Sequence, residues 1–270
     1  VYFSRWSRLL LVTLLAKLML ESGIVKFTSF AGDGTNTWRE LTALDYHYWT
    51  QPLPHGLSKW IHSLPAWFDS LSLYFMYAIE LVLPLCFFLP GNARRFALIG
   101  QVLLQLAILA SGNYGFFNLL TLCLCIPLLD DQFIPSAITN RFANSTTHTT
   151  ASKLAFRTPV LFLLFSIFIT TGYGHILNDL KGNKPNEEEY LKVPQWIESL
   201  QAEARVLRCF NSYGLFRVMT TTRPEIMIEG SIDGEDWQPY KFKWKPGNLA
   251  RSASFAGPHM PRLDWQMWFE

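Results

Sequence analysis

The chain alternates between long apolar runs and polar connections. The apolar runs cover residues 9–27, 71–89, 96–110, 116–129 and 159–173. An α-helix of about 20 apolar residues spans the hydrocarbon core of a bilayer, so these runs predict about five transmembrane helices. The third and fourth runs are short and need their flanks to cross. We therefore expect residues 1–175 to form an α-helical multi-pass membrane bundle, with an outer loop at residues 28–70.

Basic residues in the short connections predict the orientation of this bundle. They are Arg5 and Arg8 before the first run, Arg94 and Arg95 between the second and third, and Arg141, Lys153 and Arg157 between the fourth and fifth. Cytoplasmic loops are enriched in Lys and Arg, and these clusters fall on one side of the predicted bundle. The outer loop, the turn at 111–115 and everything after His175 then lie on the non-cytoplasmic side. On this topology the glycosylation sequon at Asn144 faces the cytosol.

After His175 the composition is that of a soluble domain. Pro194 opens an amphipathic helix. The apolar stripe of this helix consists of Ile197, Leu200, Ala204 and Leu207. Period-two alternation predicts strands at 225–231 and 237–245, joined by an Asp-Gly turn. We therefore expect residues 176–270 to form a small, mainly β extracytoplasmic domain in which the strands follow the amphipathic helix.

Composition narrows the classes of function. The chain is 50% hydrophobic and 16% charged, below the roughly 25% charged residues of soluble domains, and its net charge of +2 does not predict a nucleic-acid-binding protein. Three of the four cysteines lie in apolar runs, which favours buried, inert thiols over a redox pair. His47, His55 and His62 match no zinc signature, so we expect neither a metal nor a cofactor.

The outer loop holds the most distinctive polar segment, residues 38–54. Its aromatic residues fit interfacial anchors, since Trp and Tyr collect at membrane surfaces. Its charged residues fit that interpretation less well. Asp45 is two residues from His47, and an aspartate beside a histidine can orient the imidazole for proton transfer.

Charged residues inside the apolar runs need a partner or a water-filled cavity, because a charge at bilayer depth costs at least ~2.5 kcal/mol. Lys17 and Glu21 are four residues apart and can neutralise each other on one helix face. Lys26 lies at the outer end of the first run, where its amine can snorkel to the surface. Glu80 has no partner nearby in the sequence and is the better candidate for a cavity.

Seven short stretches occur in order over nearly the whole chain. They are residues 38–42, 45–48 with 50–54, 111–114 with 118–119, 130–131, 213–216, 245–247 and 261–269. Together these stretches resemble the lipase maturation factor family of membrane proteins. The resemblance implies assistance in the folding and assembly of secreted lipases. It also implies that the loop and tail face the lumen of the endoplasmic reticulum, or the periplasm in a bacterium, and that residues are missing at both ends.

A shorter stretch, residues 23–26 with the downstream Trp38, is similar to the vitamin K-dependent γ-glutamyl carboxylases. In that family a lysine serves as the base. The similarity implies Lys26 for that role in this chain.

Three functions remain open. The leading hypothesis is a non-enzymatic maturation factor that binds a secreted lipase client, because Trp, Tyr and Arg dominate interface hot spots. The expected client surface consists of Trp38, Arg39, Asp45, His47, Tyr48, Trp49, Gln51, Arg262, Asp264, Trp265 and Trp268. The alternative is a membrane-embedded acid/base enzyme, whose catalytic candidates are Lys26, Asp45, His47 and Glu80. The third is an extracytoplasmic binding scaffold, since residues 228–237 resemble turns of carbohydrate-binding β-sandwiches.

Overall fold

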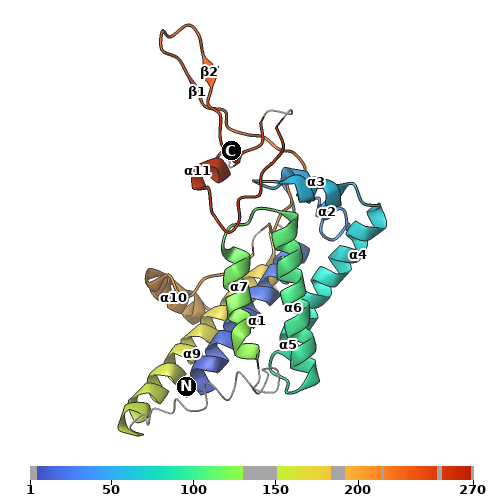
Figure 1. Ribbon diagram of the computed structural model, residues 1–270. Helices are drawn as coiled ribbons and strands as arrows, with labels where there is room; N and C mark the ends of the chain where they lie inside the picture. Colours follow the sequence, from blue (N-terminus) through green and yellow to red (C-terminus); the bar gives the residue numbers. More distant parts are fainter. Residues whose placement is uncertain (1–4, 130–150, 184–191, 215, 248–250, 269–270) are drawn as a thin grey trace, which may run out of the picture. The chain divides into compact units, whose positions relative to one another are not determined.

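The computed structural model is mostly helical (Figure 1). It describes residues 5–129, 151–183, 192–214, 216–247 and 251–268. The chain forms two compact units. Unit 1 consists of residues 1–36, 77–101 and 124–217, and unit 2 of residues 37–76, 102–123 and 218–270. The sequon at Asn144 and the Asp-Asp pair at 130–131 lie outside the described residues. The predicted domain boundary near His175 stays a prediction.

Three helical segments among the described residues are long and apolar enough to cross a membrane. The first is Ala66–Cys86, which contains α4 (Ala66–Tyr77), the π-helix η1 (Ala78–Val82) and α5 (Leu83–Cys86). The second is α6 (Asn92–Ser111), and the third is Pro159–Lys181 within α9 (Ala151–Lys181). They match the second, third and fifth predicted runs. The predicted count of five spans is not confirmed. The helix α1 (Arg5–Thr28) carries charges. The apolar segment Phe117–Leu128 is shorter than a span, and it consists of α7 (Phe117–Cys125) and η2 (Ile126–Leu128).

In unit 1 the N-terminal helix packs lengthwise on α9, as Figure 1 shows, and η1 and α5 also contact α1. Helix α10 (Gln195–Ala204) packs on α9 through its apolar stripe, with Ile197 and Ala204 buried. Gly174 permits this approach, since an added Cβ would lie 2.8 Å from Ile197 Cγ2. Leu207 is exposed in the 3₁₀ turn η4 (Arg205–Leu207), so the predicted stripe ends before it.

Two asparagines secure the chain where α1 and α9 end. The Asn36 Nδ2 group donates to the carbonyls of Lys26 and Ser29, which supplies the donors that the last turn of α1 lacks. The Asn183 side chain both donates to and accepts from the backbone of Phe30, at 2.7 Å in each case. The Asn183 bonds join the segments that follow the two helices.

In unit 2 the outer loop contains two short helices, α2 (Ala43–Thr50) and α3 (Gly56–His62), which contact each other. The tail contributes α11 (Arg262–Gln266) and a hairpin in which β1 (Glu229–Gly230) pairs antiparallel with β2 (Gln238–Pro239), drawn as two arms in Figure 1. The expected mainly β domain is not confirmed, because this sheet is the extent of strand pairing among the described residues.

A side chain takes the place of a partner strand at the end of the second predicted strand. The backbone N–H groups of Trp244 and Lys245 donate to Asp264 Oδ1 at 2.6 and 2.9 Å. A buried aspartate from α11 therefore holds this segment. Alternating residues predict an extended backbone, but they do not reveal whether its partner is a strand or a carboxylate.

Replacing Gly182 tests the junction that follows α9. Gly182 has φ +65°, and an added Cβ would overlap the Thr28 carbonyl oxygen. We expect Gly182→Ala to lower the midpoint of thermal unfolding, measured by circular dichroism in detergent, by more than Gly234→Ala does. Gly234 also has a positive φ, +79°, but a Cβ there meets open space, so only the left-handed strain of ~1–2 kcal/mol applies. Equal losses for the two variants would contradict this packing.

Candidate functional site

Lys26 and Glu80 form a buried ion pair within unit 1. Lys26 Nζ lies 2.7 and 2.6 Å from the two carboxylate oxygens of Glu80, and the two side chains are 8% and 6% exposed. Glu80 comes from η1, and π-helical segments often occur at functional sites. Gly23 lets η1 approach α1, since an added Cβ would lie 3.2 Å from Glu80 Cβ. The prediction that Lys26 snorkels to the surface is wrong, and the partner that Glu80 needed lies 54 residues away.

Lys17 and Glu21 form a second buried pair, as their spacing predicts. Their charged atoms are 2.9 Å apart, and the side chains are 6% and 0% exposed. The segment that carries the 213–216 motif closes over them: Lys17 donates to the Asn211 carbonyl and lies 4.6 Å from the centre of the Tyr213 ring. The Tyr213 N–H donates to Glu21 Oε2 at 2.8 Å. This pair therefore fixes the tail segment on α1.

The pairing of Lys26 limits its chemistry. Its ammonium donates hydrogen bonds to Glu80, whereas a general base accepts a proton. The geometry therefore fits the neutralisation of a buried charge better than it fits base catalysis.

His47 has a different partner from the one that its sequence neighbours suggest. Its Nε2 lies 2.6 Å from the Tyr114 hydroxyl oxygen, and the two rings stack at 6° to each other. Asp45 is exposed while His47 is buried, because residues two apart in α2 point to different sides of the helix. The hypothesis that Asp45 orients the imidazole is therefore wrong, and burial raises the pKa of the Tyr114 hydroxyl that takes its place.

The other two histidines of the loop also serve local structure. His55 caps the N-terminus of α3, where its Nδ1 accepts the Leu57 N–H at 3.2 Å. Burial lowers the pKa of this imidazole. His62 lies beside Tyr48, with 6.4 Å between the ring centroids. Within the described part of the chain, no three His, Cys, Asp or Glu side chains gather in a way that could hold a metal ion.

Gln51 connects the loop to the turn at 111–115. Its Nε2 donates to the carbonyls of Tyr48 and Ser111 at 3.1 and 2.8 Å. Ser58 adds a second bond to the turn, from its hydroxyl to the Ser111 carbonyl at 2.6 Å. Gly112 leaves the necessary space, because a Cβ at this position would overlap Gln51 Oε1. Two of the stretches that resemble the family are thus bonded to each other.

Asn113 connects both segments to the tail. Its Nδ2 donates to the carbonyls of Leu53 and Ser254 at 3.1 and 3.0 Å, and its Oδ1 accepts the Ala256 N–H at 2.7 Å. The side chain is 3% exposed. A buried amide whose donors and acceptor are used in this way holds three chain segments in one arrangement.

Arg223 fastens the tail to the end of α2. Its guanidinium donates to the carbonyls of Trp49 and Pro52 at 2.9 Å each, and also to the Gln51 carbonyl. Its Nε lies 2.6 Å from Glu225 Oε1. A guanidinium suits this site because its planar fork presents several donors to carbonyls that a finished helix leaves open.

The 261–269 motif is bonded to the same helix end. Trp268 Nε1 donates to the Thr50 carbonyl at 2.6 Å, and Asp264 accepts the two backbone amides already described. Sequence reasoning missed Arg223 and did not single out Asn113. Asn113 belongs to a motif stretch, so a signal existed, whereas Arg223 binds carbonyl groups, which no sequence pattern marks.

The expected client-binding residues separate by exposure. Five are buried: Trp38, His47, Tyr48, Gln51 and Asp264. Four are exposed: Arg39, Asp45, Trp49 and Arg262; Trp265 and Trp268 are half-buried. The buried members support the loop and tail from within and cannot contact a client in this conformation. The exposed members remain a predicted contact surface.

A second exposed group lies on the hairpin. This hairpin surface consists of Met227, Ile228, Ile232, Trp237 and Tyr240. Ile232 is fully exposed and Met227 is 75% exposed. Exposed apolar side chains concentrated in one short segment favour a site that binds another protein or a membrane.

Comparison with known proteins agrees with the motifs. A family model described as the lipase maturation factor transmembrane domain matches residues 3–136, and the lipase maturation factor C-terminal domain matches residues 209–270. The chain belongs to the lipase maturation factor family. This assignment confirms the resemblance on which the sequence interpretation rests.

Several relatives in this family align along nearly the whole chain. The chain is 34% identical to lipase maturation factor 2 of Xenopus tropicalis, with 99% of this chain and 48% of the relative covered. It is 32% identical to the human lipase maturation factor 2 (95% and 48% covered) and 28% identical to the human lipase maturation factor 1 (95% and 45%). The chain therefore spans about half the length of these curated relatives. No solved structure matches it.

Replacing Arg223 tests the bonds between loop and tail. We expect Arg223→Ala to lower the free energy of unfolding by about 2–4 kcal/mol, because it leaves carbonyl groups at the end of α2 without donors. Arg223→Lys should restore less than half of this loss, since one ammonium cannot reproduce the fork. The measurement is chemical unfolding in detergent, followed by tryptophan fluorescence.

Arg262→Ala is the control for this prediction. The Arg262 side chain is exposed in the same unit, so its loss should cost ~1 kcal/mol or less. If the Arg262 and Arg223 variants lose the same stability, the Arg223 hydrogen bonds do not support the unit in the way proposed.

Proposed function

We propose that this membrane protein is a maturation factor for secreted lipases that assists their folding and assembly as a chaperone, without catalysing a reaction. The relatives that align along the chain are named lipase maturation factors. One observation carries the non-enzymatic part: the polar motif residues Gln51, Asn113 and Asp264 hydrogen-bond the protein's own backbone. They act as supports rather than as reacting groups.

The client surface that we propose has two parts. The loop contributes its exposed residues Arg39 and Trp49, and the tail contributes Arg262 together with the hairpin surface. Aromatic and Arg side chains supply most of the energy of protein interfaces. A lipase that has not finished folding exposes apolar segments, and an apolar hairpin surface can bind them before they aggregate.

We further propose that the loop and tail lie in the lumen of the endoplasmic reticulum, or in the periplasm if the source is bacterial. Arg5, Arg8, Arg94 and Arg95 support this orientation, because they lie beside the ends of apolar helices that the positive-inside rule assigns to the cytoplasm. Secreted clients fold on the non-cytoplasmic side of the membrane, so a surface that binds them has to face that side.

Substitutions on the hairpin surface test client binding. We expect the variant Met227→Ser/Ile232→Ser/Trp237→Ser to co-purify at least about fivefold less of a co-expressed secreted lipase, and to yield correspondingly less active lipase. Its thermal unfolding should stay unchanged, because all three side chains are exposed. The readouts are the amount of lipase bound to the purified factor and the lipase activity in the secreted fraction.

A matched control replaces the same kinds of side chain on the other unit. The variant Trp196→Ser/Val206→Ser/Leu207→Ser removes one tryptophan and two aliphatic residues that are also exposed. It should bind the lipase normally. Normal lipase yield from the hairpin variant, or an equal loss from both variants, would contradict the proposed surface.

Variants of the buried ion pair separate the chaperone from an acid/base enzyme. Lys26→Met alone should cost about 3–5 kcal/mol of stability, because it leaves the Glu80 carboxylate buried without its counter-charge. Lys26→Met/Glu80→Leu should recover most of that loss and should support lipase maturation at the normal level. If the double variant folds, by thermal unfolding, but yields inactive lipase, Lys26 has a chemical role and the non-enzymatic proposal fails.

A further inference from the structure

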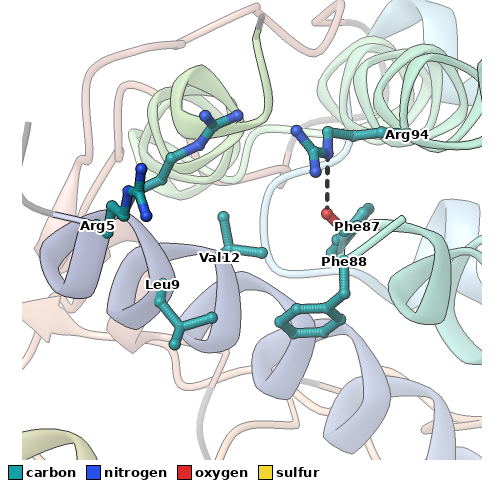
Figure 2. A pocket seen from close by; sticks show the side chains of 7 residues that line it. Arg5, Leu9, Val12, Phe87, Phe88 and Arg94 are labelled. Atoms are coloured by element: carbon teal, nitrogen blue, oxygen red, sulfur yellow. Dashed lines mark hydrogen bonds between the residues drawn. The ribbon is translucent and has the colours of Figure 1, made fainter. Parts of the chain in front are cut away.

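A pocket of about 240 Å³ lies in unit 1, where several apolar helices begin or end. It is lined by Arg5, Arg8, Leu9, Val12, Phe87, Phe88 and Arg94. Figure 2 shows Arg5 and Arg94 on opposite sides of this pocket, with Val12 between them. The pocket thus combines an apolar floor with a basic rim.

The position of the pocket corresponds to the border between hydrocarbon and water. The candidate span Ala66–Cys86 ends one residue before Phe87, and the candidate span α6 begins at Asn92. Basic and aromatic side chains at the ends of apolar helices lie at the level of the lipid headgroups. The apolar floor then continues towards the acyl chains.

The rim concentrates positive charge. Arg5 and Arg8 lie in the first turn of α1, and Arg94 lies in the first turn of α6; neither turn contains an acidic residue. The N-terminal end of α6 adds the positive end of its helix dipole. Arg8 Nε donates to the Pro127 carbonyl at 2.9 Å, and Arg94 Nε donates to the Phe87 carbonyl at 3.2 Å, a bond drawn in Figure 2. These bonds orient two of the three guanidinium groups.

We propose that this pocket binds the headgroup of an anionic phospholipid. The lipid phosphate lies between Arg5 and Arg94, and an acyl chain follows Leu9 and Phe88 towards the hydrocarbon. Guanidinium groups suit phosphate because they can donate two parallel hydrogen bonds to it. A choline headgroup carries its own positive charge, which the same rim repels. The site is independent of the client surface, which uses residues of unit 2.

Lipid binding to the purified full chain tests the site. Native mass spectrometry in detergent would measure the retention of phosphatidylglycerol and of phosphatidylcholine with identical acyl chains. We expect phosphatidylglycerol to bind at least about tenfold more tightly, as a rim with three arginines favours a net negative headgroup. Glycerol phosphate, which lacks acyl chains, should not compete at equal concentration. Equal affinity for the two lipids, or full competition by glycerol phosphate, would overturn the proposal.

Matched variants assign the effect to the pocket. Arg5→Gln/Arg94→Gln should weaken phosphatidylglycerol binding about 25-fold, from roughly fivefold for each basic residue at an anionic membrane surface. Arg205→Gln/Arg208→Gln changes the net charge equally at exposed positions of the same unit and should have little effect. If the first variant does not fold, Arg5→Gln alone should still give the fivefold loss, because the Arg5 side chain is exposed. Equal losses from the two double variants would show charge attraction without a site.

Discussion

A charge inside an apolar helix has to be neutralised, and in this protein that requirement governs how the N-terminal helix meets the rest of its unit. Lys17 and Glu21 neutralise each other and draw in the backbone of the 213 segment. Lys26 reaches across to Glu80 on η1. Because removing one partner of a buried ion pair costs several kcal/mol, each pair fixes a contact that apolar packing alone would leave free to slide. The charged residues of α1 thus determine which segments pack against this helix.

The same requirement operates on uncharged groups in the other unit. The end of α2 leaves carbonyl oxygens without donors, and the tail supplies them from Arg223 and Trp268. The Asn113 side chain likewise donates hydrogen bonds to one carbonyl of the loop and one of the tail. Side chains that satisfy backbone groups of distant segments hold irregular structure in place where helix and sheet are scarce. This explains how a unit with one small sheet among its described residues keeps a defined arrangement.

Buried supporting residues and exposed contact residues have different relations to the family motifs. Several of the residues by which the chain resembles its family are buried supports, such as Gln51, Asn113 and Asp264. Some side chains available to a partner, such as Met227 and Trp237, lie between the motifs in the hairpin. Arg39 and Arg262 are available as well, although they belong to motif stretches. A support tolerates little change because its hydrogen bonds depend on exact geometry, while a surface that binds unfolded chains needs only to be apolar and exposed.

The sequence by itself determined the apolar helices, the family, and the Lys17–Glu21 pair, because each depends on residues close together or on the order of short motifs. The α10 stripe over Ile197 and Ala204 followed from helical periodicity in the same way. Tertiary structure alone decided that Glu80 pairs with Lys26, that Tyr114 rather than Asp45 contacts His47, and that Asp264 takes the place of a strand. Such partners come from segments far apart in the chain. Periodicity records which face of an element is buried, but it does not record what lies against that face.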